Sequence, residues 1–217
     1  MNNAILTKAG RVMGGKECRN LMGRYAFYYS AFRFADLADL WARREDSLLV
    51  MPWGIYDGYE SIRRCYVEQM GDRNNPGMEQ FLKGKMFLRE FNTEILAVAG
   101  DAKTARGFWI SMGQDAYMKD NGFAQADWVW AKYAVEFIND GGVWRIWKLR
   151  VFPVFSCPFE TDWSVNPEYK GFVFENAQPD RPLPEPLWHW TLTGSYPSDQ
   201  PDFPKDYDSY EDIGFIL

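Results

Sequence analysis

The stretch 127-DWVWAKYAVEFINDGGVWRIWKLRVFPVF-155 gives the strongest indication of the fold. Apolar and polar residues alternate through its first half, and aromatic and β-branched residues fill its second half. Both patterns are typical of β-strands, and the Asn-Asp-Gly-Gly run between them is typical of a tight hairpin turn. The stretch therefore predicts two long antiparallel strands at residues 126–138 and 143–155.

The residues before this stretch extend the same pattern. Strands are expected near residues 85–98 and 103–114, joined by the turn sequence Ala-Gly-Asp-Ala-Lys at 99–103. The four strands would form an antiparallel meander. An earlier short strand at 47–53 would make the sheet mixed.

The N-terminal part has the 3.6-residue periodicity of helices instead. Helices are expected at residues 3–13, 16–44 and 60–70, with Gly14-Gly15 interrupting the first two. Helices that cover one face of a curved antiparallel sheet define an α+β fold. We predict a cone-shaped α+β barrel or roll: a strongly curved, mostly antiparallel sheet wrapped on N-terminal helices, with a cavity on its concave face.

The last part of the chain differs in composition. Residues 156–217 hold 9 of the 12 prolines, 12 acidic residues and only 3 basic ones. They also hold many aromatic residues, which disordered segments avoid. We therefore divide the chain into a domain at 1–155 and a long irregular C-terminal arm at 156–217, which packs on the body or on a neighbouring subunit.

Composition also excludes several classes of function. A single histidine rules out a zinc site built on several histidines. A net charge of −6, concentrated in the arm, argues against nucleic acid as a partner. No apolar run is long enough to span a membrane, the N-terminus does not resemble a secretory signal, and the three cysteines have no CxxC spacing. We expect a cytoplasmic protein without metal or cofactor.

Four stretches together resemble the nuclear transport factor 2-like superfamily, in particular its SnoaL-like branch. They are CRNLMGRYAFYYSAFRFADLADLWA (18–42), LVMPWGIYDGYESIRRCY (49–66), NTEILAVAGDAKTARGFW (92–109) and YAVEFINDGGVWRIWKLRV (133–151). The superfamily includes scytalone dehydratase, bile acid dehydratase, ketosteroid isomerase and a lignin-dimer formaldehyde lyase, as well as non-catalytic binding modules. Its enzymes use acid and base side chains in a dry conical pocket.

The resemblance carries over only in part at the level of residues. Tyr25 matches the tyrosine that the dehydratases have on the first helix. Ser30 lies near the place of their aspartate. Their histidine falls between Leu88 and Phe91 here, and neither of these two can move a proton. The dehydratase set of tyrosine, aspartate and histidine is therefore broken.

Candidate catalytic residues follow from their chemistry. Tyr25 and Tyr29 lie one helical turn apart, so both hydroxyls could enter the cavity and donate to an oxyanion, or each could bond a backbone carbonyl. Lys148 and Arg150 share a strand face with Ile146 and Phe152, which is either concave, and then lines the pocket, or convex.

His189 is the fifth candidate. It either packs in the arm or caps a pocket as the one acid or base that titrates near neutral pH. Six further side chains are candidates for binding the substrate: Trp53, Tyr56, Arg106, Trp109, Trp130 and Tyr133. Most of these are aromatic, and their number points to an aromatic ligand.

We therefore expect a cofactor-independent lyase that eliminates water or formaldehyde from a hydroxylated aromatic or polycyclic small molecule. The alternative is a non-catalytic module of the same fold that binds an apolar ligand or pairs with another subunit. Aromatic residues on the outer positions of the last strands predict a homodimer or homotrimer.

Overall fold

The computed structural model describes residues 2–119, 122–162, 164, 177–184, 190, 193–194 and 202–217, with the backbone alone for residues 2–6. Its central feature is one six-stranded sheet in the order β2-β1-β6-β5-β4-β3. The strands are β1 (Leu48–Met51), β2 (Gly54–Asp57), β3 (Met86–Val98), β4 (Thr104–Met118), β5 (Ala124–Asp140) and β6 (Val143–Pro158). Only β1 and β6 pair in parallel.

The predicted meander is confirmed, including both hairpin turns. β3 to β6 lie side by side and antiparallel, as the alternating sequence indicated. Ala102, Gly141 and Gly142 have positive φ angles at the two turns, which is the conformation that such hairpins need. β2 was not predicted, because its four residues were interpreted as part of the turn that leads into the next helix.

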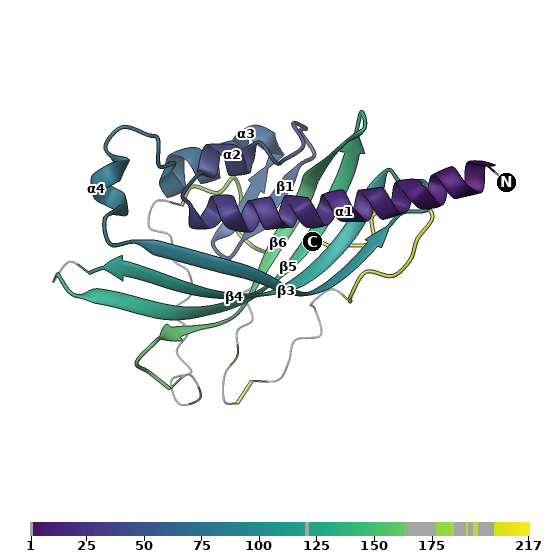
Figure 1. The fold of residues 1–217 in the computed structure, drawn as a ribbon. Helices are drawn as coiled ribbons and strands as arrows, with labels where there is room; N and C mark the ends of the chain where they lie inside the picture. The colour runs from purple at the N-terminus through teal and green to yellow at the C-terminus, as the bar shows by residue number, and fades with distance from the viewer. Residues whose placement is uncertain are drawn as a thin grey trace.

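The helices lie on one side of the sheet, and the sheet does not close into a barrel. The fold is therefore α+β, as predicted (Figure 1). They are α1 (Asn2–Ser30), α2 (Phe34–Ala38), α3 (Gly58–Arg63), the π-helix η1 (Arg64–Gly71) and α4 (Met78–Leu82). The main core lies between these helices and the concave face. Tyr25, Trp41 and Tyr66 are completely buried there.

Two predicted helix boundaries are wrong, and tertiary packing is involved in both. α1 runs through Gly14-Gly15 without a break. Gly14 provides room for packing: a Cβ there would lie 2.6 Å from Cζ2 of Trp144. The predicted helix at 16–44 ends at Ser30, and Phe32 takes a φ of 55° before α2 begins. That left-handed residue turns the chain and buries Phe32 against Phe34.

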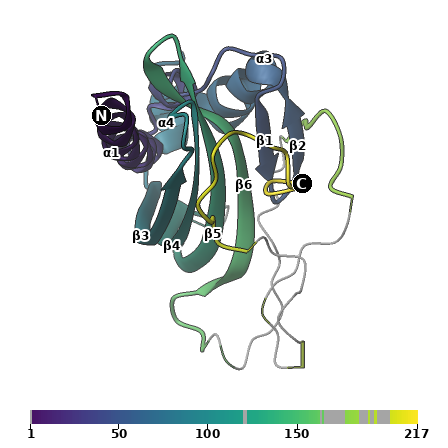
Figure 2. The ribbon, with the colours of Figure 1, turned by 90° about the vertical axis from the view of Figure 1, so that its right-hand side faces the viewer.

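The C-terminal residues 202–217 lie across the outer, convex face of the sheet (Figure 2). Phe215 and Ile216 are buried there against Val50, Ile55 and Phe152. Backbone bonds also join Gly100 and Asp101 to the carbonyls of Tyr207 and Asp208. This segment therefore packs on the chain's own body.

Candidate active site

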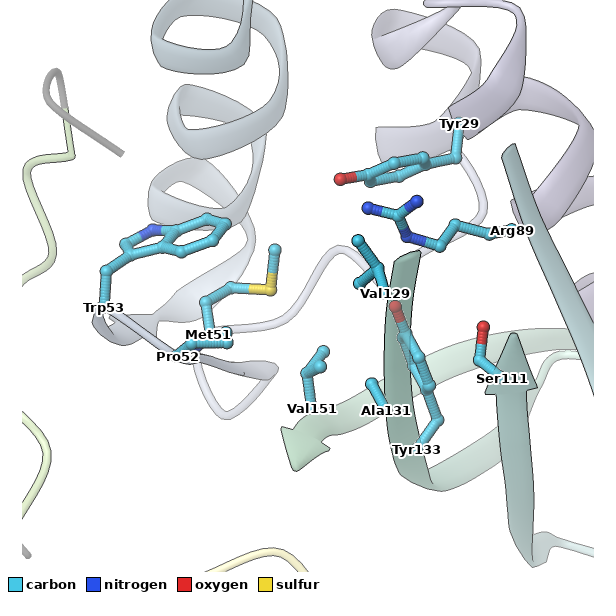
Figure 3. A pocket seen from close by; sticks show the side chains of 10 residues that line it. All are labelled: Tyr29, Met51, Pro52, Trp53, Arg89, Ser111, Val129, Ala131, Tyr133 and Val151. Carbon is cyan, nitrogen blue, oxygen red and sulfur yellow. The ribbon is translucent and has the colours of Figure 1, made fainter. Parts of the chain in front are cut away.

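One narrow pocket opens on the concave side of the sheet, between α1 and the turn from β1 to β2. Its cavity volume is about 20 Å³, room for about one water molecule with the side chains as they lie. Its lining comes from seven elements or turns (Figure 3). The lining residues are Tyr29, Met51, Pro52, Trp53, Arg89, Ser111, Val129, Ala131, Tyr133 and Val151. The apolar side chains surround four polar tips, an arrangement typical of small-molecule sites.

Arg89 is the charged group of this pocket. Its guanidinium donates two hydrogen bonds to Asp115, Nη1 to Oδ1 at 2.6 Å and Nη2 to Oδ2 at 2.8 Å. Nη1 also donates to the carbonyl of Leu88. Only 6% of the Arg89 side chain and 12% of the Asp115 side chain is exposed. A guanidinium has five N–H donors. These contacts use three, and Arg89 also donates to the Tyr133 hydroxyl, so one donor is left for a ligand.

The backbone of β4 makes room for this cation. Gly113 lies opposite Arg89 across the β3–β4 pair. A Cβ at Gly113 would approach the carbonyl oxygen of Leu88 to 2.6 Å and Nη1 of Arg89 to 2.8 Å. Glycine is thus required for the guanidinium to lie against the strand.

Two tyrosines face the same space as Arg89. Cζ of Arg89 lies over the Tyr29 ring, 5.3 Å from the ring centroid, so the cation packs against the face of the ring. Burial raises the pKa of both the Tyr29 and the Tyr133 hydroxyl, although the nearby Arg89 guanidinium acts to lower them. Both phenols therefore stay protonated near neutral pH and can donate hydrogen bonds.

Ser111 supplies the fourth polar tip. Its side chain is buried, with 1% of the residue exposed, and its hydroxyl has no hydrogen-bond partner among the described residues. Figure 3 shows this hydroxyl on the same side of the pocket as Arg89 and Tyr133. A buried hydroxyl without a partner costs about 1–3 kcal/mol, which a polar ligand atom would recover.

Three of the residues predicted from the sequence lie in this pocket: Tyr29, Trp53 and Tyr133. Tyr25 lies behind it, completely buried, with its hydroxyl 2.9 Å from that of Tyr66. Tyr56 supports the wall from outside, because it accepts a 3.0 Å hydrogen bond from Nε1 of Trp53.

Six of the predicted residues are placed elsewhere or not described. Trp109 packs against Phe137 in the core, and Trp130 stacks on Phe155 on the outer face. Arg106, Lys148 and Arg150 also belong to the outer face, where they bond Glu136 and the C-terminal segment. His189 lies outside the described residues.

The outer placement of the two strand cations has a physical reason. Glu136 pairs with Lys148 but Phe137 pairs with Ile146, so β6 carries an extra residue, a bulge, at this point. The bulge puts Ile146 in the core and Lys148 and Arg150 on the convex face. The prediction that Ile146 shares their face was wrong, and the convex alternative holds.

Arg89, Ser111 and Asp115 were missed by sequence reasoning. The histidine position of the dehydratases was placed between Leu88 and Phe91, and Arg89 is one of the two residues inside that interval. A single arginine among apolar strand residues was the available signal. Among the described residues, no group of three or more His, Cys, Asp or Glu side chains could hold a metal ion.

Comparison with known proteins identifies the family. Residues 15–150 match the SnoaL-like domain, so the chain belongs to that family. No curated protein matches the chain.

No described helix is long and apolar enough to cross a membrane.

Solved structures of the nuclear transport factor 2-like superfamily share the fold. A hexachlorocyclohexane dehydrochlorinase, LinA-type3 from Novosphingobium barchaimii, has a TM-score of 0.53 at 18% identity, over 71% of this chain and 96% of that one. A scytalone dehydratase-like protein from Novosphingobium aromaticivorans has a TM-score of 0.52 at 11% identity, over 75% and 94%. A superfamily protein from Salmonella enterica serovar Typhimurium has 0.51 at 15%, over 65% and 92%.

Proposed function

We propose that this protein is a cofactor-independent lyase that eliminates water or formaldehyde from a small hydroxylated aromatic compound. The observation that carries this proposal is the buried Arg89 guanidinium beside three neutral hydroxyls in a narrow apolar pocket. Such a set of donors stabilises an oxyanion in surroundings from which water is largely excluded. The dehydratase-like and dehydrochlorinase neighbours support the same class of reaction.

The chemistry follows from where charge would develop. A substrate phenolate held by Arg89 can push its electron pair through the ring and expel a hydroxide from the side-chain carbon in the para position. The phenolate becomes a quinone methide, the carbon–oxygen bond breaks, and the leaving hydroxide takes a proton from a tyrosine hydroxyl. The tyrosine is then protonated again by solvent. In this step the electron pair moves through the aromatic ring of the substrate itself.

Asp115 is assigned a supporting role in this scheme. Its two oxygens both bond Arg89, so it holds the guanidinium against β4 and balances its charge before the ligand enters. A second candidate function is favoured by the composition of the pocket lining. Because no carboxylate is among the lining residues, the pocket suits a non-catalytic module that binds an anionic aromatic ligand.

Mass spectrometry of the purified protein with a panel of substrates tests the proposal. The panel contains phenolic aryl-propanoid dimers, hydroxysteroids and small polyketides, with no cofactor added. We expect at least one phenolic compound to lose the mass of water or of formaldehyde. A panel that stabilises the protein against heat but stays chemically unchanged would favour the binding module instead.

The variant Tyr29→Phe separates the two functions. In an enzyme that draws a proton from this hydroxyl, the rate should fall by about 100-fold or more. In a binding module the loss should be about 1 kcal/mol of affinity, the net value of one hydrogen bond. Tyr28→Phe, on the same helix but outside the pocket lining, is the matched control and should change neither quantity.

A further inference from the structure

Residues 177–181, which we call the strap, lie beside β2 although they are far from it in the sequence. The backbone N–H of Ile55 donates to the carbonyl of Arg181 at 2.9 Å, and the N–H of Asp180 donates to the carbonyl of Ile55 at 2.9 Å. Ile55 and Arg181 thus pair as in an antiparallel sheet. The strap continues the sheet past β2.

Side chains fix the strap on both sides of this pairing. Arg181 donates to both oxygens of Asp57, at 2.7 and 2.9 Å. Asp180 accepts from Arg64 at 2.6 Å and from the backbone N–H of Asp57 at 2.8 Å. Single exposed ion pairs contribute little, but a bidentate pair within a network holds its geometry better.

The strap also presses on the turn that carries the pocket wall. Gly54 has a φ of 146°, and a Cβ there would lie 2.4 Å from Cβ of Pro179. Gly54 follows Met51, Pro52 and Trp53, all of which line the pocket. Only glycine allows this close approach of the strap to the turn.

A chain of hydrogen bonds leads from the strap to Trp53. Gln178 donates its backbone N–H to Oε1 of Gln69 at 3.1 Å and accepts from Nε2 of Gln69 at 3.3 Å. The same Oε1 accepts from the hydroxyl of Tyr56 at 2.8 Å. That hydroxyl accepts from Nε1 of Trp53 at 3.0 Å.

We propose that the strap and Gln69 position Trp53, and that this position sets the size of ligand that the pocket accepts. Trp53 and the side chains beside it form the apolar wall opposite Arg89 (Figure 3). Gln69 touches no ligand in this account and acts as a positioning residue. The part that concerns ligands rests on the proposed function, whereas the part that concerns Trp53 does not.

Fluorine NMR of protein labelled with fluorotryptophan tests the positioning directly. The variant Trp53→Phe assigns the Trp53 signal. We expect Gln69→Leu, which keeps the side-chain volume but removes the relay, to shift or broaden this signal while those of Trp109 and Trp144 stay unchanged. Arg181→Ala should have the same effect, since it loosens the strap from Asp57. A Trp53 signal identical to the wild type in both variants would overturn the proposal.

Two further variants exclude a general loss of structure. Gln69→Glu keeps an acceptor for the Tyr56 hydroxyl and for the Gln178 N–H but loses the donor to the Gln178 carbonyl, so it should shift the Trp53 signal less than Gln69→Leu does. Gln80→Leu makes the same substitution at an exposed position in α4 and should have no effect. A shift of the Trp53 signal in Gln80→Leu as large as that in Gln69→Leu would contradict the relay.

Ligand size is tested with two phenolates that differ by one fused ring, 4-nitrophenolate and 4-nitro-1-naphtholate, titrated by absorbance. In Gln69→Leu we expect the ratio of their dissociation constants to change by about tenfold in favour of the larger ligand, the scale at which a pocket wall discriminates. An unchanged ratio would refute the role in ligand size. If neither phenolate binds the wild type, the proposed oxyanion pocket fails, while the Trp53 signal still decides the role of the strap.

Discussion

At the scale of single residues, the site depends on a buried charge and its partner. Removing one member of such a pair leaves an uncompensated charge and costs about 3–5 kcal/mol. Arg89 donates hydrogen bonds to Asp115 and to the Leu88 carbonyl, and it lies against the backbone of Gly113, where no Cβ is in its way. A change to any of these contacts should reach the pocket.

The variant Gly113→Ala tests this dependence. The added methyl group would meet the Leu88 carbonyl and the Arg89 guanidinium, so we expect a loss of about 1–3 kcal/mol in the free energy of unfolding. Gly23→Ala is the control: a Cβ at Gly23 meets nothing within 4 Å, so this variant should lose no stability and gain up to about 1 kcal/mol from helix propensity. Urea denaturation measures both. Equal stability of Gly113→Ala and the wild type would contradict the crowding.

The pH dependence of stability follows from the buried phenols. Burial raises the pKa of Tyr25, Tyr29, Tyr66 and Tyr133 above the ordinary value. The unfolded chain then releases these protons first, so their contribution to stability is complete below about pH 10 and is lost as the pH rises above it. We expect the melting temperature to fall above that pH. In the folded protein, the tyrosinate absorbance of these four residues should appear at a higher pH than in the unfolded chain. Full ionisation of all twelve tyrosines at their ordinary pKa in folded protein would refute this.

Sequence could predict the aromatic residues of the site better than the polar ones. Tyr29 followed from helical spacing, and Trp53 and Tyr133 from aromatic residues in or near strands. Arg89 could not be assigned to a face, because the β3–β4 register shifts between Asn92 and Ile95 and reverses the alternation along β3. For Trp130 the prediction was wrong, although the alternation could have excluded it: Trp130 lies three residues from Tyr133, so the two cannot share a face of β5.

At the scale of elements, the sequence predicted the four long strands and the presence of helices, but not the helix ends. The strands follow from period-two alternation and well-defined turn residues. The end of α1 depends on Phe32, which adopts a left-handed conformation rare for such a residue and is stabilised by burial in the core. A packing cause of this kind leaves no local pattern in the sequence.

The two glycines inside α1 should respond differently to alanine. Gly14 contacts Trp144 so closely that Gly14→Ala should cost about 1–3 kcal/mol of stability. Gly15 has only ordinary contacts, 3.6 Å and longer, so Gly15→Ala should gain up to about 1 kcal/mol from helix propensity. Thermal and urea unfolding of the pair measure this. Similar effects at both positions would argue against the packing of α1 on β6.

At the scale of the whole molecule, the C-terminal segment covers the outer face of the sheet. It brings Tyr210 to Lys148 and Glu136, and the carbonyl of Glu211 to Arg106. These contacts explain why cations considered for the pocket are instead partly or fully buried on the opposite face. The division at residue 155 and a homodimer or homotrimer stay predictions, which limited proteolysis and light scattering would test.

The variant Phe215→Ala measures how firmly this segment is held. Phe215 is 4% exposed, so its truncation should cost about 3–5 kcal/mol in the free energy of unfolding. Phe203, in the same segment but 52% exposed, is the matched control, and Phe203→Ala should stay within about 0.5 kcal/mol of the wild type. If both truncations have equally small effects, the segment contributes little to the stability of the fold.

The ionisation of a phenol inside the pocket tests the oxyanion-binding role of Arg89 most directly. If Arg89 stabilises an oxyanion, binding should lower the pKa of 4-nitrophenol, as followed by its absorbance. The double variant Arg89→Gln/Asp115→Asn removes the buried pair without leaving a lone charge and should abolish this effect. The matched variant Arg106→Gln/Glu136→Gln removes a buried pair on the outer face and should retain it. An unchanged or raised pKa of the phenol bound to the wild type, or equal behaviour of the two double variants, would refute this role of Arg89.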